Sequence, residues 1–147
     1  MKLLTTLTLL LLTMPTFAND HLITIESQNS VQATADKFVQ LVESKGLRLF
    51  ARIDHAKNAA GVDLELNPTE VILFGNPNAG TVLMQCAATV AIDLPQKALV
   101  WEDAGGKVWL AYPNPEFLKE LHSIEGCDPV LGKISTLLSG LASAATQ

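Results

Sequence analysis

The sequence is poor in the residue types on which many small enzymes depend. Its 147 residues include 3 His and 2 Cys, and aromatic residues make up 5%. It contains no Gly-x-Ser-x-Gly nucleophile motif, phosphate-binding loop, dinucleotide-binding glycine pattern, His-Glu-x-x-His or haem-attachment Cys-x-x-Cys-His. We therefore expect no catalytic residue, no bound metal and no cofactor, and favour a protein that is not an enzyme.

The sequence also lacks clusters of Lys or Arg. It has 10 basic and 15 acidic residues, which give a formal net charge of −5. Nucleic acids and anionic membrane surfaces attract proteins with basic patches. The charge pattern therefore argues against both as partners.

The first 18 residues are typical of a secretory signal peptide. Lys2 precedes an apolar stretch over 3–12, which is followed by Pro15 and then by the small residue Ala18. A membrane anchor would need about 20 uninterrupted apolar residues. We therefore expect cleavage between Ala18 and Asn19, a periplasmic or secreted protein, and no stable membrane insertion once the signal is removed.

The remaining residues, 19–147, have the length of one domain. Export would place Cys86 and Cys127 in an oxidising compartment, where a disulfide is their expected state. That disulfide would close a loop of about 40 residues and stabilise the fold by about 4 kcal/mol in the chain-entropy model. The alternative is two free thiols that bind a soft metal such as copper, which neither a Cys-x-x-Cys spacing nor a nearby His supports.

Hydrophobic periodicity predicts five strands. Apolar residues alternate with polar ones over 21–26 and 47–53, and an unbroken apolar run over 71–74 predicts a central strand. The last two strands, 97–102 and 107–112, flank Asp103-Ala104-Gly105-Gly106, a strong hairpin signal that would place Trp101 opposite Trp109.

The same reading predicts two long helices and three short ones. The long helices cover 31–45, between Ser30 as N-cap and Gly46 as a left-handed C-cap, and 128–142, with Asp128 as N-cap and fraying beyond 142. The short helices are predicted over 55–60, 81–88 and 115–122. The element order predicts an α+β fold, a two-layer sandwich of a mostly antiparallel five-strand sheet packed by the two longer helices.

Several motifs, in order, resemble the domain-of-unknown-function 302 family over about residues 30–122. The motifs are Phe50-Ala51-Arg52-Ile53-Asp54-His55, Pro68-Thr69-Glu70, Phe74-Gly75-Asn76-Pro77, Gly80-Thr81, Leu83-Met84, Asp93-Leu94-Pro95 and Val100-Trp101-Glu102-Asp103. The resemblance implies a TBP-like α+β fold with a curved sheet, often a homodimer, and no known activity. Exported members carry similar cysteines, which also implies a disulfide. Gln96 and Pro113 depart from the family pattern, without threatening the fold.

Five polar residues at strand and helix ends are candidate ligand-binding residues. Asp54 and His55 follow a predicted strand, where they would form a proton-carrying pair or, more simply, a helix cap and its neighbour. Glu70 is placed to reach His55 or Arg52, with a structural ion pair as the simpler interpretation. Asn76 offers an amide to a ligand, although Asn before Pro is ordinary turn chemistry. Glu102 enters the hairpin, where a solvated charge is the default.

Two hypotheses of different class follow. The first is an exported, non-catalytic binding or interaction module that acts as a homodimer. The second is a metal-dependent or acid–base enzyme, in which His55 converges with Glu70 and Glu102, joined by His122, at one edge of the sheet.

Overall fold

A single antiparallel sheet forms the centre of the fold. The computed structural model describes residues 21–147, so the expected signal peptide and cleavage position lie outside the described residues. The sheet has the strand order β1-β5-β4-β3-β2, and every neighbouring pair is antiparallel. The strands are β1 (Leu22–Ser27), β2 (Arg48–Asp54), β3 (Thr69–Gly75), β4 (Gln96–Glu102) and β5 (Val108–Pro113).

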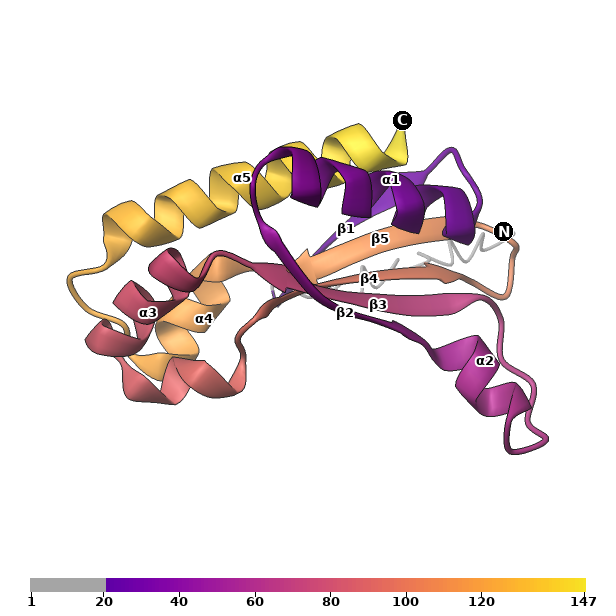
Figure 1. The fold of residues 1–147 in the computed structure, drawn as a ribbon, viewed down its shortest axis with the longest axis horizontal. Helices are drawn as coiled ribbons and strands as arrows, with labels where there is room; N and C mark the ends of the chain where they lie inside the picture. The colour runs from indigo at the N-terminus through magenta and orange to yellow at the C-terminus, as the bar shows by residue number, and fades with distance from the viewer. Residues whose placement is uncertain (1–20) are drawn as a thin grey trace, which may run out of the picture.

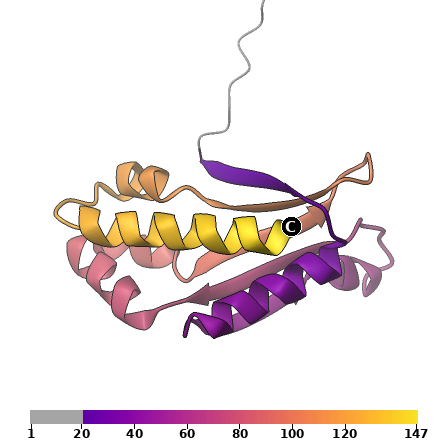
Figure 2. The same ribbon diagram turned by 90° about the horizontal axis from the view of Figure 1, so that it is seen from above.

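The two long helices, α1 (Val31–Ser44) and α5 (Asp128–Thr146), lie side by side on one face of the sheet (Figures 1 and 2). The shorter helices lie at the ends of the sheet. They are α2 (His55–Ala60), α3 (Pro77–Cys86), the 3-10 helix η1 (Ala88–Ile92) and α4 (Pro115–His122). The predicted two-layer α+β sandwich is therefore confirmed. Within residues 21–147, no helix is long and apolar enough to cross a membrane.

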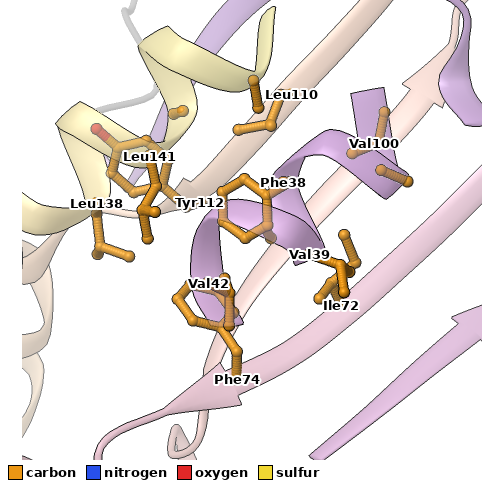
Figure 3. Packing of buried hydrophobic residues seen from close by; sticks show 14 of the residues in the cluster. Phe38, Val39, Val42, Ile72, Phe74, Val100, Leu110, Tyr112, Leu138 and Leu141 are labelled. Carbon is orange, nitrogen blue, oxygen red and sulfur yellow. The ribbon is translucent and has the colours of Figure 1, made fainter. Parts of the chain in front are cut away.

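The core lies between the sheet and the two long helices (Figure 3). Phe38 from α1 meets Phe74 from β3 edge to face, with ring centroids 5.1 Å apart. The apolar run in β3 is buried on one face only, because Ile72 and Phe74 are buried whereas Val71 and Leu73 are half-buried. β3 is thus an interior strand with a less covered second face, but the central strand of the sheet is β4 and not β3 as predicted.

The hairpin between β4 and β5 forms as its sequence predicts. Trp101 and Trp109 lie opposite each other in the register. Asp103 and Lys107 close the loop, where the Asp103 amide donates to the Lys107 carbonyl at 2.8 Å and Gly106 has φ +78°. The Asp103 carboxylate accepts from the amides of Gly105 and Lys107 and from Trp109 Nε1 at 2.8 Å. Asp103 therefore organises the hairpin.

Several helix limits differ from the predictions. Asp128 is the first residue of α5 and Cys127 occupies the N-cap position, so the prediction of Asp128 as N-cap was wrong. α3 begins at Pro77, four residues before the predicted start, because Asn76 caps it. The end of α5 does not fray, since Thr146 is buried and its carbonyl accepts from the Gln28 amide at 2.9 Å.

The predicted disulfide joins Cys86 and Cys127, whose Cα atoms lie 6.4 Å apart with a sequence separation of 41. Cys86 ends α3, and Cys127 directly precedes α5. A second, smaller core surrounds this bond, formed by Leu83, Val90, Ile124, Cys127 and Leu131. The disulfide and this core together hold α3 against the beginning of α5.

Candidate ligand-binding site

Glu70, at the beginning of β3, is bound within the chain. Its exposure is 8%, and its two carboxylate oxygens accept from Nε and Nη2 of Arg52 on β2, the latter at 3.0 Å. Arg52 Nη1 also donates to Asp36 Oδ1 on α1 at 2.7 Å. The predicted structural ion pair between Glu70 and Arg52 is present, and Asp36 extends it to three residues.

The pKa values of Arg52 and Asp36 favour the charged forms of these two residues. The hydrogen bond to Glu70 raises the pKa of Arg52 above its usual range, against the effect of burial. Hydrogen bonds from Gln32 and then from Arg52 lower the pKa of Asp36. The cluster is therefore a hydrogen-bonded network of one guanidinium and two carboxylates that joins α1 to the sheet.

Asp54 and His55 do not join Glu70 in a site. Asp54 lies opposite Glu70 in the sheet register, and its Oδ1 caps α2 by accepting from the Lys57 amide at 2.8 Å. His55 is the first residue of α2 and is exposed, and it forms no hydrogen bond or ion pair with Glu70 or Glu102. Asp54 thus has the capping role that its position predicts.

Glu102 and His122 are held elsewhere. Glu102 lies opposite Val108 at the end of β4, and its carbonyl accepts from Asn67 Nδ2 at 3.4 Å. His122 Nε2 pairs with Asp93 Oδ2 at 2.7 Å, and its Nδ1 lies 3.1 Å from Thr89 Oγ1. In the part of the chain that the structure describes, no three His, Cys, Asp or Glu residues are grouped to hold a metal ion.

Asn76, at the other end of β3, is an N-cap. Its Oδ1 accepts from the Asn78 amide at 2.9 Å, and Pro77 follows as the first helical residue of α3. This capping role is sufficient to explain why an Asn occupies this position. Its place in the fold is nevertheless informative, because Asn76 also lines a large groove.

The groove has a volume of about 790 Å³ and lies where α3 and α5 meet the end of the sheet. One wall is α3 and another is the first half of α5, which Figure 1 shows at the same end of the molecule. The floor comes from the end of β3, the beginning of β4 and the beginning of β2. Its lining is mainly apolar and includes the side chains of Phe50, Leu83, Met84, Leu94, Ile134 and Leu137.

Gln96 is the polar residue at the floor of this groove. Its exposure is 7%, and its Nε2 atom has no hydrogen-bond partner among residues 21–147. It lies opposite Phe74 in the register, on the sheet face that α1 and α5 cover. A buried amide without a partner is costly for a folded protein. Among the fully buried side-chain nitrogen and oxygen atoms of residues 21–147, Gln96 Nε2 is the one without a hydrogen-bond partner.

The charged residues that line the groove are both cationic. Arg48 comes from the beginning of β2 and Lys133 from α5. Both are exposed, and neither forms an ion pair within the described residues. The Arg48 guanidinium carbon lies 5.0 Å from the centroid of the Phe50 ring.

Sequence reasoning missed Gln96, Arg48 and Lys133 as site residues. The one available signal was Gln96 itself, a polar residue at the start of a strand whose inward positions 98 and 100 are apolar. Arg48 and Lys133 are 85 positions apart in the sequence and meet only through the fold.

Comparison with a solved structure supports the fold. The crystal structure of an uncharacterized conserved DUF302 protein from Bacillus stearothermophilus matches with a TM-score of 0.77. The match covers 86% of this chain and 98% of that chain, at 14% sequence identity. At this identity, the likeness shows a shared fold.

Curated relatives are more similar to this chain in sequence than the solved structure is, but they are much longer than this chain. The proteins named Fluoride-specific ion channel FluC 1 from Brucella suis biovar 1 (strain 1330) and from Brucella abortus biovar 1 (strain 9-941) are each 44% identical over 111 residues. The aligned region is 76% of this chain but 44% and 41% of those two proteins. The chain therefore spans less than half the length of the curated relatives that it matches.

A family match extends over most of the described residues. The family described as Domain of unknown function DUF302 matches residues 23–141, which include β3, the disulfide and all but the last turns of α5. The fold, the solved structure and this match agree, and the chain belongs to the DUF302 family.

Proposed function

We propose that this DUF302 protein is an exported, non-catalytic module that binds a small, largely apolar molecule in the groove between α3 and α5. The observation that carries the proposal is the mainly apolar groove of about 790 Å³, which the polar residue Gln96 also lines. Small-molecule sites have volumes of about 300–1,000 Å³ and combine an apolar lining with a few polar groups. The groove has these properties.

Apolar side chains around the groove support the proposal. Phe50, Val82 and Met84 are 45%, 40% and 38% exposed, although all three are large hydrophobic residues. A ligand in the groove would cover this surface and gain about 25 cal/mol for each Å² of apolar area removed from water. The channel activity in the names of the Brucella proteins is not carried over, because the matched segment is less than half of each of them.

Binding of a neutral fluorescent apolar probe, N-phenyl-1-naphthylamine, tests this function. We expect the purified protein to enhance the probe's fluorescence and the Val82→Asp variant to lose most of the effect, because a carboxylate would face the apolar ligand. Val62→Asp is the matched control, since Val62 is 66% exposed outside the groove. Absence of probe binding by the wild-type protein, or equal binding by Val82→Asp, would contradict the proposed function.

We also propose that the protein acts as a homodimer through the open face of the sheet, the face turned away from α1 and α5. The alternation along the strands places partly exposed apolar side chains on this face: Val71, Leu73, Leu99, Trp101 and Trp109. Glu26 and Lys97 share the face, so it carries both signs of charge. A two-fold interface places one surface against itself, and a mixed surface of this kind suits a second copy.

Sedimentation equilibrium tests the homodimer. We expect a dimer at micromolar concentration for the wild-type protein and a monomer for Leu99→Lys, which introduces a charge at the centre of the open face. Leu121→Lys is the control, because Leu121 is 54% exposed on α4. Circular dichroism establishes that both variants are folded, and a monomeric wild-type protein would contradict the proposal.

Export is part of the same proposal and rests on the N-terminal pattern of residues 1–18. We expect protein recovered from the periplasm to begin at Asn19, as intact-mass spectrometry would report. The enzyme alternative has weaker support, because Arg52 occupies both oxygens of Glu70, whereas His55 contacts neither carboxylate.

A further inference from the structure

We propose that each copy in the homodimer docks its α2 arm on η1 of the second copy. The α2 arm consists of α2 and residues 61–68, which connect α2 to β3. This docking rests on the proposed homodimer and deepens it, because it states which ends of the two copies meet. The exposed hydrophobic side chains of the arm and of η1 carry the proposal.

Exposed hydrophobic side chains gather in the α2 arm and at η1. Ile92 of η1 is 81% exposed, the highest value for a large hydrophobic residue within 21–147. Val62, Leu64 and Leu66 lie within one short segment of the arm and are 66%, 65% and 50% exposed. Single exposed apolar residues are ordinary, whereas grouped ones mark interaction sites. The arm therefore carries an apolar patch that the described chain leaves uncovered.

The α2 arm and η1 project on the side of the open face, at opposite ends of the sheet. In Figure 1, α1 and α5 lie above the sheet, whereas α2 lies below it at the right and the segment after α3 lies below it at the left. Figure 2 also places α2 and α3 at opposite ends of the molecule. η1 follows α3 and packs against α3 and α4. The open face is therefore flanked by the α2 arm at one end and by η1 at the other.

A two-fold axis can bring two open faces together in two ways. If the axis runs from end to end of the sheet, the two α2 arms meet; if it runs across the sheet, each arm meets η1 of the second copy. Asp63 and Glu65 are exposed in the arm, so the first arrangement brings like charges together, which is unfavourable. Residues 76–92, which include η1, contain no charged residue, and the next carboxylate, Asp93, pairs with His122. The charges therefore favour the second arrangement.

The α2 arm also offers a hollow for an apolar side chain. The hollow has a volume of about 630 Å³. Ala56 and Ala60 line it from α2, and Leu64 and Leu66 line it from the rest of the arm. Ile92 is the exposed large hydrophobic residue of η1, so we expect it to occupy this hollow in the second copy.

The arm is ordered by contacts within its own chain. The backbone amides of Val62 and Leu64 both donate to the Ala59 carbonyl at 3.0 Å, which holds this segment against the end of α2. The far end of the arm is tied to the hairpin, because Asn67 Nδ2 donates to the Glu102 carbonyl at 3.4 Å. A surface that is ordered before binding loses little conformational freedom when it binds. The apolar patch is thus part of a preformed surface.

Chemical cross-linking of two different cysteine variants tests the contact. Leu64→Cys and Ile92→Cys each add one thiol to a chain whose described cysteines are joined in a disulfide. We expect a short bismaleimide to link the two variants once they have been mixed and have exchanged subunits, because the arm of one copy meets η1 of the other. Neither variant alone should cross-link, since identical positions then lie at opposite ends of the dimer. Gln40→Cys, at an exposed position on α1, is the control and should not link to Leu64→Cys.

Sedimentation equilibrium measures how much the contact contributes to dimerisation. Ile92→Ser removes the apolar side chain from both copies, so we expect the dissociation constant of the dimer to rise about tenfold or more. Leu121→Ser is the matched control, because it removes an apolar side chain that is 54% exposed on α4. This control should change the dissociation constant by less than about twofold. Circular dichroism establishes that both variants are folded.

The outcomes separate this contact from the homodimer itself. A wild-type dimer in which Leu64→Cys links to Ile92→Cys no better than to Gln40→Cys would overturn the contact and leave the homodimer standing. Cross-linking of Leu64→Cys to itself would overturn the contact as well, since like ends would then meet. So would a dissociation constant that Ile92→Ser leaves unchanged or that Leu121→Ser raises equally. A monomeric wild-type protein would overturn both proposals.

Discussion

The two ends of β3 differ in how their polar groups are satisfied. At the Thr69-Glu70 end, the carboxylates of Glu70 and Asp36 both accept hydrogen bonds from Arg52. At the Gly75 end, within residues 21–147, Gln96 has a buried donor without a partner and Arg48 has no ion pair. One end is complete without a ligand, and the other lines an apolar groove.

The difference between the two ends shows that a polar residue with partners inside the chain is weak evidence for a ligand-binding site. A charged residue in a sheet draws attention in a sequence, but Glu70 is explained by its partners. Gln96 is uncharged and is less conspicuous in the sequence. Burial of its amide nevertheless lowers the stability of the folded protein, because no group in the described residues accepts a hydrogen bond from Nε2. The groove at the Gly75 end is therefore better evidence for a ligand than the satisfied carboxylate of Glu70 is.

The largest expected effect comes from the disulfide, which belongs to the groove end of the molecule. The double variant Cys86→Ala/Cys127→Ala should lose about 4 kcal/mol in the free energy of unfolding, because the bond closes a long loop in the unfolded chain. Urea denaturation measures this loss. Amide hydrogen exchange should show the loss of protection concentrated in α3, with β2 and β3 less affected. Uniform loss across the molecule would remove the distinction between the two ends.

A smaller loss is expected at the paired end. Glu70→Gln should destabilise the protein by about 2–3 kcal/mol, because it leaves Arg52 with a single charged partner, while the 30% exposure of the Arg52 side chain moderates the cost. Glu26→Gln breaks a pair whose side chains are 50% or more exposed, so we expect a change below about 0.5 kcal/mol. Equal effects of the two variants would show that the cluster of Glu70, Arg52 and Asp36 has no special role in stability.

A change of opposite sign is expected at the groove end. Gln96→Leu should stabilise the ligand-free protein by about 1 kcal/mol, because it removes the unpaired buried amide at similar volume. Thermal unfolding of the purified protein, free of ligand, measures the change. A lower unfolding temperature for Gln96→Leu would mean that the Gln96 amide has a hydrogen-bond partner in solution. The two ends of β3 would then not differ in how their polar groups are paired.

The smallest expected effect is a pH dependence at the hairpin. Hydrogen bonds, first from Trp109 Nε1 and then from the Lys107 amide, lower the pKa of Asp103 below its usual value. Its contribution to stability is therefore present above the unfolded pKa and is lost as the pH falls through the folded pKa. Between about pH 5 and pH 3, the wild-type protein should lose more stability than Asp103→Asn does. Parallel urea midpoints for the two proteins over that range would contradict this role.

Local signals in the sequence account for most of the fold. Alternating apolar residues located the strands, and the Trp101–Trp109 pair followed from the loop length. Asn-Pro pairs mark the starts of two helices, at Asn76 and at Asn114, because Asn caps and Pro suits the first turn. The prediction used the second pair and interpreted the first as a turn, so α3 was placed four residues late.

The site depended on contacts that a sequence does not display. The Glu70–Arg52 pair was foreseeable, since both residues lie on strands that are close in the chain. The groove was not, because it combines the ends of β3 and β4 with α3 and α5, and because the absence of a partner for Gln96 is a property of three-dimensional packing. The buried end of α5 was missed for the same reason, since Thr146 is held by Gln28 from the opposite end of the chain.

One measurement tests the central claim most directly, that the Gly75 end of β3 binds a ligand and the Glu70 end does not. N-phenyl-1-naphthylamine is titrated into the isotopically labelled protein while backbone amide shifts are recorded by NMR. The account predicts saturable shifts at Arg48, Gln96 and Lys133 and along α3, with the amides of Asp36, Arg52 and Glu70 unmoved. Shifts centred on the Glu70 end, or no saturable shift in the groove, would contradict it.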